Sequence, residues 1–264
     1  MEKESELKKF WGELAGAKKR VLMLDYDGTL SPFRKERDKA LPYPGVREIL
    51  DEILETACSR LVIISGRWTK DIIPLLGLKS LPEIWGSHGL ERKFPDGRAK
   101  IVDLDRRVRE ALTGAYDLAV GEGFEERLER KPGALALHWR GLDPEQIDDI
   151  RGWAVDAWSA FTTGADTALY KFDGGIELRS KNKNKGDAVS TILAEEGEDC
   201  CAAYLGDDQT DEDAFHSLKG KGLSVLVREE FRDTEADIWL RPPDELLEFL
   251  GKWYRVCTGK AWPV

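Results

Sequence analysis

Short apolar runs alternate with amphipathic stretches toward both ends of this chain. Runs of strand length, rich in Val, Ile and Leu, lie at residues 19–25, 61–64, 84–85, 201–205 and 223–227. Helical spacing of apolar residues follows at residues 44–57, 68–76, 210–218 and 242–254. Buried strands that alternate with helices are typical of a parallel sheet, because helices then cover both faces. The pattern therefore predicts an α/β domain built on a parallel sheet.

The middle of the chain has a different pattern. A Phe94-Pro-Asp-Gly97 turn separates short strand patterns at 90–93 and 99–102, and further strand patterns occur at 128–131, 134–139, 169–172 and 176–179. Helices are predicted at 105–120 and 144–160. We therefore expect a core made of residues 1–90 and 181–264, with residues 91–180 inserted as a smaller α+β domain.

The composition narrows the possible functions. The 264 residues carry a net charge of −10, whereas nucleic-acid-binding proteins usually present a basic face, so we expect no nucleic-acid partner. No apolar run approaches the ~20 residues of a membrane helix, so we expect no membrane contact. The four cysteines form no C-x-x-C pair, which fits a reducing cytoplasm. We expect a cytoplasmic monomer that binds a small molecule, and local basic residues leave an anionic substrate possible.

The first candidate site is Asp25-Tyr-Asp27-Gly-Thr29, directly after a buried strand. Ligands bind at the carboxyl ends of strands in open α/β sheets. Two carboxylates at such an end can share a cation, or divide the roles of nucleophile and general acid/base. The alternative is an Asx-rich turn that closes the strand without a chemical role.

Two further motifs suit an oxyanion. Ser65-Gly66-Arg67 follows the second strand, and its hydroxyl and amides lie near a helix start. Lys185, in Asn184-Lys185-Gly186-Asp187, also lies near a helix start and can neutralise a phosphate. The alternatives are an ordinary Ser-Gly turn and a solvated lysine.

The last motif, Gly206-Asp207-Asp208-Gln-Thr210-Asp211-Glu-Asp213, contains five acidic residues within a short distance of a strand end. Their mutual repulsion would be relieved by a hard cation such as Mg²⁺. Helix capping is the alternative for Thr210 and Asp213. It leaves Asp207 and Asp208 unexplained.

Together these motifs resemble those of the haloacid dehalogenase-like (HAD) phosphatases. Longer segments are similar to the trehalose-6-phosphate phosphatases: Leu24–Pro32, Gly86-Ser-His-Gly-Leu-Glu91, Glu129-Arg-Lys131 with His138-Trp-Arg140, Glu177-Leu-Arg179 and Gly206–Phe215. The resemblance covers about residues 20–250 and implies a Rossmann-like HAD core in which the inserted α+β domain is a cap that closes over a sugar phosphate.

The resemblance also implies a mechanism. Asp25 would attack phosphorus to form an aspartyl-phosphate, while Asp27 would protonate the leaving oxygen and then activate water. The metal would be Mg²⁺, held by Asp25, the Asp27 carbonyl, Asp207 and Asp208. The residues implied to bind phosphate are Ser65, Gly66, Arg67 and Lys185.

In such a cap, polar side chains would bind the sugar. The residues at matching positions, together with one in the core, are His88, Glu129, Lys131, His138, Arg140 and Glu177. Without the resemblance, His138 would be interpreted as a core histidine, and Glu129 with Lys131 as a surface cross-strand pair. One departure is Arg179-Ser180, where the family more often has Arg-Pro.

The resulting hypothesis is a Mg²⁺-dependent phosphatase acting on trehalose 6-phosphate. Three alternatives stay open. One is a phosphatase for another sugar phosphate, such as a glycosyl phosphoglycerate or sucrose phosphate. Another is a non-catalytic regulatory module, and the third is a phosphotransferase with an acceptor other than water.

Overall fold

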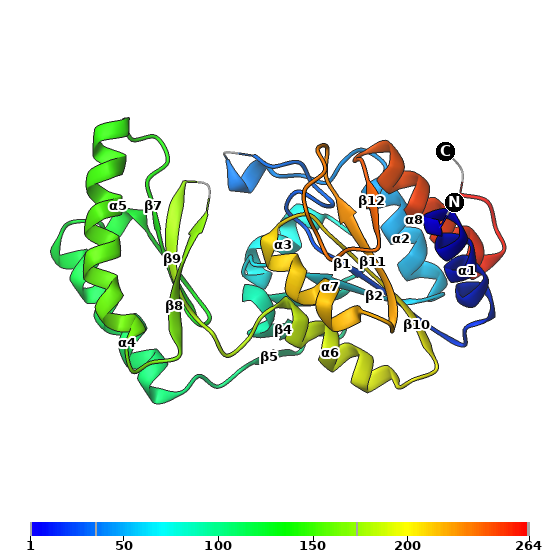
Figure 1. Cartoon of the computed structure of the whole chain (residues 1–264), viewed down its shortest axis with the longest axis horizontal. Helices are drawn as coiled ribbons and strands as arrows, with labels where there is room; N and C mark the ends of the chain where they lie inside the picture. Colours follow the sequence, from blue (N-terminus) through cyan, green and yellow to red (C-terminus); the bar gives the residue numbers. More distant parts are fainter. Residues whose placement is uncertain (1, 35, 173, 263–264) are drawn as a thin grey trace. The chain divides into compact units, whose positions relative to one another are not determined.

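The computed structural model describes residues 2–34, 36–172 and 174–262 and divides into two units (Figure 1). The first unit comprises Met1–Lys100 and Asn184–Val264, and the second is Ile101–Lys183. The second unit is thus an insertion into the first. It begins at Ile101 rather than at residue 91, and ends at Lys183 rather than at residue 180.

The first unit is built on an eight-stranded sheet in the order β12-β11-β10-β1-β2-β3-β4-β5. The strands are β1 (Lys19–Leu24), β2 (Arg60–Ile64), β3 (Glu83–Gly86), β4 (Glu91–Lys93), β5 (Ala99–Ile101), β10 (Cys200–Gly206), β11 (Gly222–Val227) and β12 (Ile238–Leu240). Neighbours from β12 to β3 pair in parallel, which confirms the predicted parallel sheet.

The later start of the insertion has a simple cause. β4 pairs antiparallel with β3, so the hairpin around the Pro-Asp-Gly turn extends the large sheet. Its residues are mostly polar, and those of β5 are exposed, so the hairpin lacks the apolar pattern by which the central strands were recognised.

Helices cover both faces of this sheet, as predicted. They are α1 (Glu2–Gly16), α2 (Val46–Thr56), α3 (Thr69–Leu76), α6 (Lys185–Glu196), α7 (Glu212–Leu218) and α8 (Asp244–Thr258). Alternate residues of β1 enter different cores. Leu22 and Leu24 pack with residues of α1, α2, α3 and α8, whereas Val21 and Met23 pack with residues of α6 and α7. β1 is therefore buried on both faces, and its end is fixed in the middle of the sheet.

One α-helix and one strand were not predicted. α1 carries a stripe at helical spacing, in which Phe10, Trp11 and Leu14 are buried, but the sequence analysis predicted no helix there. The short strand β12, at the edge of the sheet, was also missed because three residues give little periodicity.

The second unit has a four-stranded antiparallel sheet in the order β6-β7-β9-β8, with helices α4 (Arg106–Gly121) and α5 (Pro144–Ser159). Its strands are β6 (Leu128–Lys131), β7 (Ala134–His138), β8 (Thr167–Phe172) and β9 (Gly175–Ser180). Leu135, Leu137 and Trp158 belong to a separate hydrophobic core. Each of these elements matches a predicted one, apart from small shifts at the ends.

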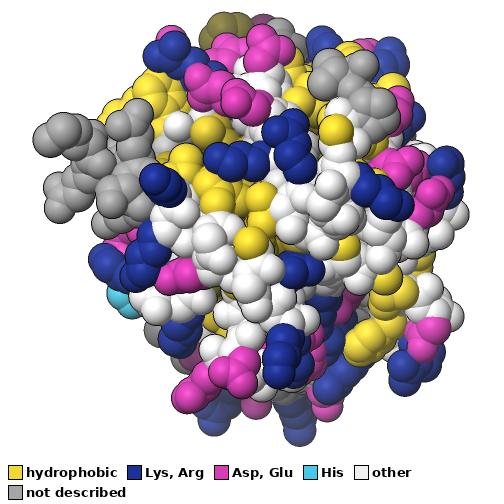
Figure 2. Space-filling model, turned by 90° about the vertical axis from the view of Figure 1, so that its right-hand side faces the viewer, with side chains coloured by type: hydrophobic (Ala, Val, Ile, Leu, Met, Phe, Trp, Pro, Cys, Tyr) yellow, Lys and Arg dark blue, Asp and Glu magenta, His cyan; other side chains and the backbone are white. Residues whose placement is uncertain are grey.

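The acidic excess is not gathered on the face drawn in Figure 2. Basic and acidic side chains are interspersed there, with small hydrophobic areas between them. Among the described residues, no helix is both long and apolar enough to cross a membrane.

Candidate active site

Two adjacent parallel strands bring the first and last motifs together. The backbone N–H of Asp25 donates to the carbonyl of Leu205 at 2.8 Å, which extends the pairing of β1 and β10 beyond β1. After Asp25 the chain turns at Gly28, whose φ is +82°. A Cβ at Gly28 would lie 2.2 Å from Oδ2 of Asp207, so the close approach of this turn to Asp207 requires glycine.

Asp25 is a buried carboxylate with two hydrogen-bond donors. Lys185 Nζ donates to its Oδ1 at 2.8 Å, and the Thr29 hydroxyl donates to its Oδ2 at 3.2 Å. Only 3% of Asp25 is exposed. Burial raises the pKa of the Asp25 carboxyl to about 8, although the Lys185 ammonium opposes that rise. The structure thus places Lys185 directly on the predicted nucleophile.

Asp211 is a site residue that the sequence analysis did not single out. Its Oδ1 accepts from Lys185 Nζ at 2.8 Å and from the Tyr204 hydroxyl. Its Oδ2 accepts from the backbone N–H groups of Asp207 and Asp208, at 3.1 and 3.0 Å. Asp211 is completely buried, so it orients both the lysine and the loop that follows β10. It was present among the five acidic residues of the motif, but spacing alone gave it no role.

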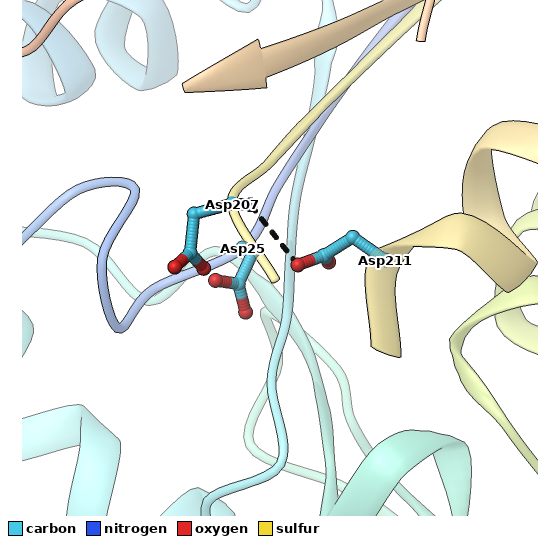
Figure 3. A group of neighbouring side chains, drawn as sticks. All are labelled: Asp25, Asp207 and Asp211. Atoms are coloured by element: carbon cyan, nitrogen blue, oxygen red, sulfur yellow. Dashed lines mark hydrogen bonds between the residues drawn. The ribbon is translucent and has the colours of Figure 1, made fainter. Parts of the chain in front are cut away.

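The carboxylates of Asp25, Asp207 and Asp211 form a buried acidic cluster (Figure 3). One oxygen from each lies within 4.8 Å of the others. Burial and the Asp25 carboxylate raise the pKa of Asp207 well above its usual range. No donor among the described residues reaches the buried Oδ2 of Asp207. Lys185 offers one positive charge against the three carboxylates of the cluster. The remaining negative charge suits a cation that prefers oxygen ligands.

Asp208, which the sequence analysis predicted beside the metal, makes hydrogen bonds within its own loop. Its Oδ1 accepts from the backbone N–H and the hydroxyl of Thr210, at 2.7 and 2.6 Å. Asp208 is thus the N-cap of a short 3-10 helix, Gln209–Asp211, whereas the sequence analysis assigned the cap to Thr210. Burial by itself would raise the pKa of Asp208, but the Lys185 ammonium and the hydrogen bonds from Thr210 outweigh burial and lower that pKa. Its carboxylate stabilises the loop and is not a member of the acidic cluster.

Asp27 and Arg67 form a bidentate ion pair. Arg67 Nε donates to Oδ2 of Asp27 at 2.6 Å, and Nη2 donates to Oδ1 at 2.5 Å. Arg67 is 5% exposed, while the Asp27 side chain is 29% exposed. The guanidinium predicted to bind phosphate is therefore bound to the predicted general acid/base.

Ser65, Gly66 and His88 lie together at the end of β2. Ser65 is fully buried, and its hydroxyl accepts from the Arg67 backbone N–H at 3.1 Å. The His88 N–H donates to the Ser65 carbonyl at 3.0 Å, and a Cβ at Gly66 would lie 2.5 Å from the imidazole. His88 and the preceding Ser87 have φ of +55° and +50°, a strained conformation of the kind found at functional sites. The structure brings these predicted residues together.

In the second unit, four predicted residues form one cluster on the sheet. His138 Nε2 lies 2.9 Å from Oε2 of Glu129, and Lys131 Nζ donates to Oε1 of Glu177 at 2.9 Å. Lys131 Nζ lies 3.7 Å from the same Glu129 oxygen, which links the two pairs. Lys131 and Glu177 have side chains that are 7% exposed, which exceeds the burial of an ordinary surface cross-strand pair.

Arg140 follows β7 by two residues. Its side chain packs against the turn before β9, where a Cβ at Gly174 would lie 2.4 Å from Arg140 Cγ. The cluster therefore links β6, β7 and β9, and Arg140 lies at the end of the sheet.

Known proteins match most of the chain. The family model described as trehalose-phosphatase matches residues 23–237. Trehalose-phosphate phosphatase B of Arabidopsis thaliana is 30% identical over 274 residues, which are 93% of this chain and 70% of that protein.

Solved structures share the fold. The C-terminal domain of the C. albicans trehalose-6-phosphate phosphatase has a TM-score of 0.75 at 23% identity, over 94% of this chain and 96% of that one. A haloacid dehalogenase-like hydrolase from B. subtilis has a TM-score of 0.57 at 15% identity, over 90% and 99%. These likenesses confirm the predicted HAD fold. Since the family model spans every motif from Asp25 to Asp208, this chain belongs to the trehalose-phosphatase family of phosphoric monoester hydrolases.

Proposed function

We propose that this protein hydrolyses trehalose 6-phosphate to trehalose and inorganic phosphate, through an aspartyl-phosphate and with Mg²⁺ bound beside Asp25. The observation that carries the proposal is the buried Asp25 carboxylate at the end of the central strand, 2.8 Å from Lys185, in a chain of this family. A carboxylate in such a place can act as a nucleophile toward phosphorus.

In the first step, an Asp25 oxygen forms a bond to phosphorus and the bond from phosphorus to the sugar oxygen breaks. Asp27 gives a proton to that leaving oxygen. Asp27 must then carry a proton at the start, whereas in the structure both of its carboxylate oxygens accept hydrogen bonds from Arg67. We therefore expect this pair to loosen when substrate binds.

In the second step, water attacks the phosphorus of the aspartyl-phosphate and the bond to Asp25 breaks, which releases phosphate. Asp27 accepts the proton from that water. The ionised Asp27, held by Arg67, suits this step, because a base must be unprotonated and fixed in direction.

The acidic cluster supports the assignment of Mg²⁺. Asp25 and Asp207 would hold the ion, which would give a partner to the buried Oδ2 of Asp207 that no donor among the described residues reaches. Bound Mg²⁺ would reduce the repulsion between the anionic nucleophile and the anionic phosphate. Asp211 is already bonded to Lys185, Tyr204 and two N–H groups, so we assign it to orientation rather than to the metal.

Donors beside Asp25 would bind the phosphoryl oxygens. Lys185 provides a buried ammonium, and Ser65 provides a buried hydroxyl at the end of the next strand. Burial by itself would lower the pKa of Lys185, but the Asp211 and Asp25 carboxylates outweigh it and keep the amine charged. A fixed positive charge of this kind stabilises charge that develops in the transition state.

We assign sugar recognition to the cluster of Glu129, Lys131, His138 and Glu177. Charged groups that are already oriented by one another can hydrogen-bond hydroxyls with little loss of side-chain entropy. We further propose that the protein acts as a monomer in the cytoplasm, which size-exclusion chromatography and cell fractionation would test.

The test is phosphate release from a panel of substrates, with Mg²⁺ and with EDTA. The panel holds trehalose 6-phosphate, sucrose phosphate, a glucosyl phosphoglycerate and glucose 6-phosphate. We expect the highest kcat/KM for trehalose 6-phosphate and loss of activity in EDTA. A higher kcat/KM for another sugar phosphate would overturn the substrate assignment, and full activity in EDTA would overturn the metal assignment.

A further inference from the structure

A guanidinium outside the catalytic motifs holds the residues that follow β10. Arg232 donates from Nε to the carbonyl oxygen of Asp207 at 3.1 Å and from Nη2 to the carbonyl oxygen of Asp208 at 2.6 Å. Arg228 adds a longer contact to the Asp207 carbonyl, at 3.4 Å. Both arginines lie between β11 and β12, in a segment with no regular secondary structure.

Arg232 and Asp211 hold the same two residues from opposite sides. The N–H groups of Asp207 and Asp208 donate to the Asp211 carboxylate, and their carbonyl groups accept from Arg232. Hydrogen bonds with a charged partner are about twice as strong as neutral ones. The N–H and carbonyl groups of both Asp207 and Asp208 are therefore each bonded to a charged side chain.

This backbone matters because the Asp207 carboxylate lacks a side-chain anchor at one oxygen. Its buried Oδ2 accepts no hydrogen bond from the described residues. The direction of the Asp207 side chain toward Asp25 therefore depends on the backbone that carries it.

Arg232 is itself anchored at the start of α7. Its Nη1 donates to the Glu212 carboxylate and to the carbonyl of Asp233. Glu212 also accepts from the Thr234 hydroxyl and the Glu235 N–H, each at 2.9 Å. The Arg232 side chain is only 19% exposed. A partly buried arginine with four such bonds has a defined position, so it can define the position of the loop.

We propose that Arg232 is a positioning residue for the cation site: it fixes the backbone of Asp207 and Asp208 so that Asp207 presents its carboxylate beside Asp25. The inference rests on the proposed function, in which these carboxylates bind Mg²⁺. Residues that orient metal ligands typically change metal affinity by about 10–100-fold when they are replaced.

The experiment is calorimetric titration of the metal-free, full-length protein with MgCl₂. The variants are Arg232→Gln, which loses the charge and the paired donors, and Arg232→Lys, which keeps the charge but donates from a single nitrogen. The control is Arg241→Gln, since the Arg241 guanidinium lies over the Trp239 ring. We expect the Kd for Mg²⁺ to rise about 10–100-fold in Arg232→Gln, to rise less in Arg232→Lys, and to stay unchanged in the control.

A second measurement separates positioning from a general structural role. If Arg232 positions a metal ligand, saturating Mg²⁺ restores most of the kcat of Arg232→Gln. A wild-type Kd in Arg232→Gln overturns the inference, as does a loss of kcat that added Mg²⁺ does not restore. If Arg232→Gln does not fold, judged by its melting curve in EDTA, the same criteria apply to Arg232→Lys. Absence of Mg²⁺ binding by the wild type would overturn the proposed metal dependence as well.

Discussion

The guanidinium of Arg67 holds the carboxylate of Asp27 through two parallel hydrogen bonds, of 2.6 and 2.5 Å. Arg67 follows β2, while Asp27 follows β1, so adjacent strands bring together residues 40 positions apart. The sequence predicted both residues at this edge of the sheet but assigned Arg67 to the phosphate. The geometry gives it a second candidate role, as the group that orients the general acid/base.

Replacement of Arg67 by Gln distinguishes these two roles. If Arg67 orients Asp27, turnover of trehalose 6-phosphate falls about 100-fold, the usual cost of a misplaced catalytic group. The first step with p-nitrophenyl phosphate falls much less, because its leaving group needs little protonation. The measurement is single-turnover release of the leaving group, trehalose or p-nitrophenol, which reports the first step for each substrate.

The variant Asp27→Asn serves as the reference for the Arg67 test, since it removes proton transfer directly. A phosphate-binding role for Arg67 predicts a different result, namely a raised KM and equal losses on the two substrates. That result would show that the Asp27 pair breaks during turnover and that Arg67 then binds the substrate.

Asp25→Asn should abolish turnover, because an amide is a poor nucleophile toward phosphorus. The fold should survive, since Asn keeps the size of the side chain and one acceptor for Lys185 Nζ. Single-turnover assays on both substrates, with Asp148→Asn on the exposed surface of α5 as a control, measure the effect. Substantial phosphate release by the variant would exclude Asp25 as the nucleophile.

The sequence predicted those parts of the site that directly follow strands, because the carboxyl ends of neighbouring parallel strands meet at one edge of a sheet. Asp25, Ser65 and Asp207 were located in this way. The pattern did not predict contacts that depend on irregular backbone. Asp211 accepts two N–H groups only because Gln209–Asp211 forms a 3-10 turn, whose path has no periodic signal.

The sequence pattern also did not predict which acidic residue has which role. Asp207 and Asp208 are adjacent and chemically identical, yet one belongs to the acidic cluster and the other caps a turn. Arg232 lies 25 residues from the carbonyl that it holds, in a segment with no motif. Such assignments need the three-dimensional path of the chain.

Asp211→Asn should lower the free energy of unfolding, in addition to any effect on turnover. The Asp211 carboxylate accepts four hydrogen bonds, and one of its donors is the buried ammonium of Lys185. An amide nitrogen in place of one oxygen would oppose N–H or ammonium donors. Breaking a buried charge pair in this way costs about 3–5 kcal/mol.

The measurement for Asp211→Asn is the urea midpoint for unfolding of the first unit in EDTA. The control is Asp199→Asn, at an exposed position. EDTA removes any contribution from a bound cation, so the comparison reports the interactions of the Asp211 side chain with the rest of the protein. A midpoint equal to that of wild type would show that Asp211 is dispensable for the loop.

The substrate assignment depends most on Glu129, which lies far in sequence from the catalytic motifs. In the second unit it joins His138 at 2.9 Å and Lys131 at 3.7 Å. If this cluster binds sugar hydroxyls, Glu129→Ala lowers kcat/KM for trehalose 6-phosphate about 10–150-fold, the effect of losing one hydrogen bond of ~1.5–3 kcal/mol to a charged group. The small aryl phosphate should be spared, because it offers no hydroxyls to that cluster.

A purely structural role for Glu129 predicts something else, because loss of its ion pairs would lower thermal stability and affect both substrates alike. The matched control is Arg130→Ala, one residue along β6, where the side chain alternates to the other face of the sheet and lies over the Tyr116 ring. The measurement is kcat/KM for the two substrates, with a melting curve for each variant. Parallel losses on both substrates in Glu129→Ala would count against a sugar contact and would favour a phosphatase that does not recognise the disaccharide through this cluster.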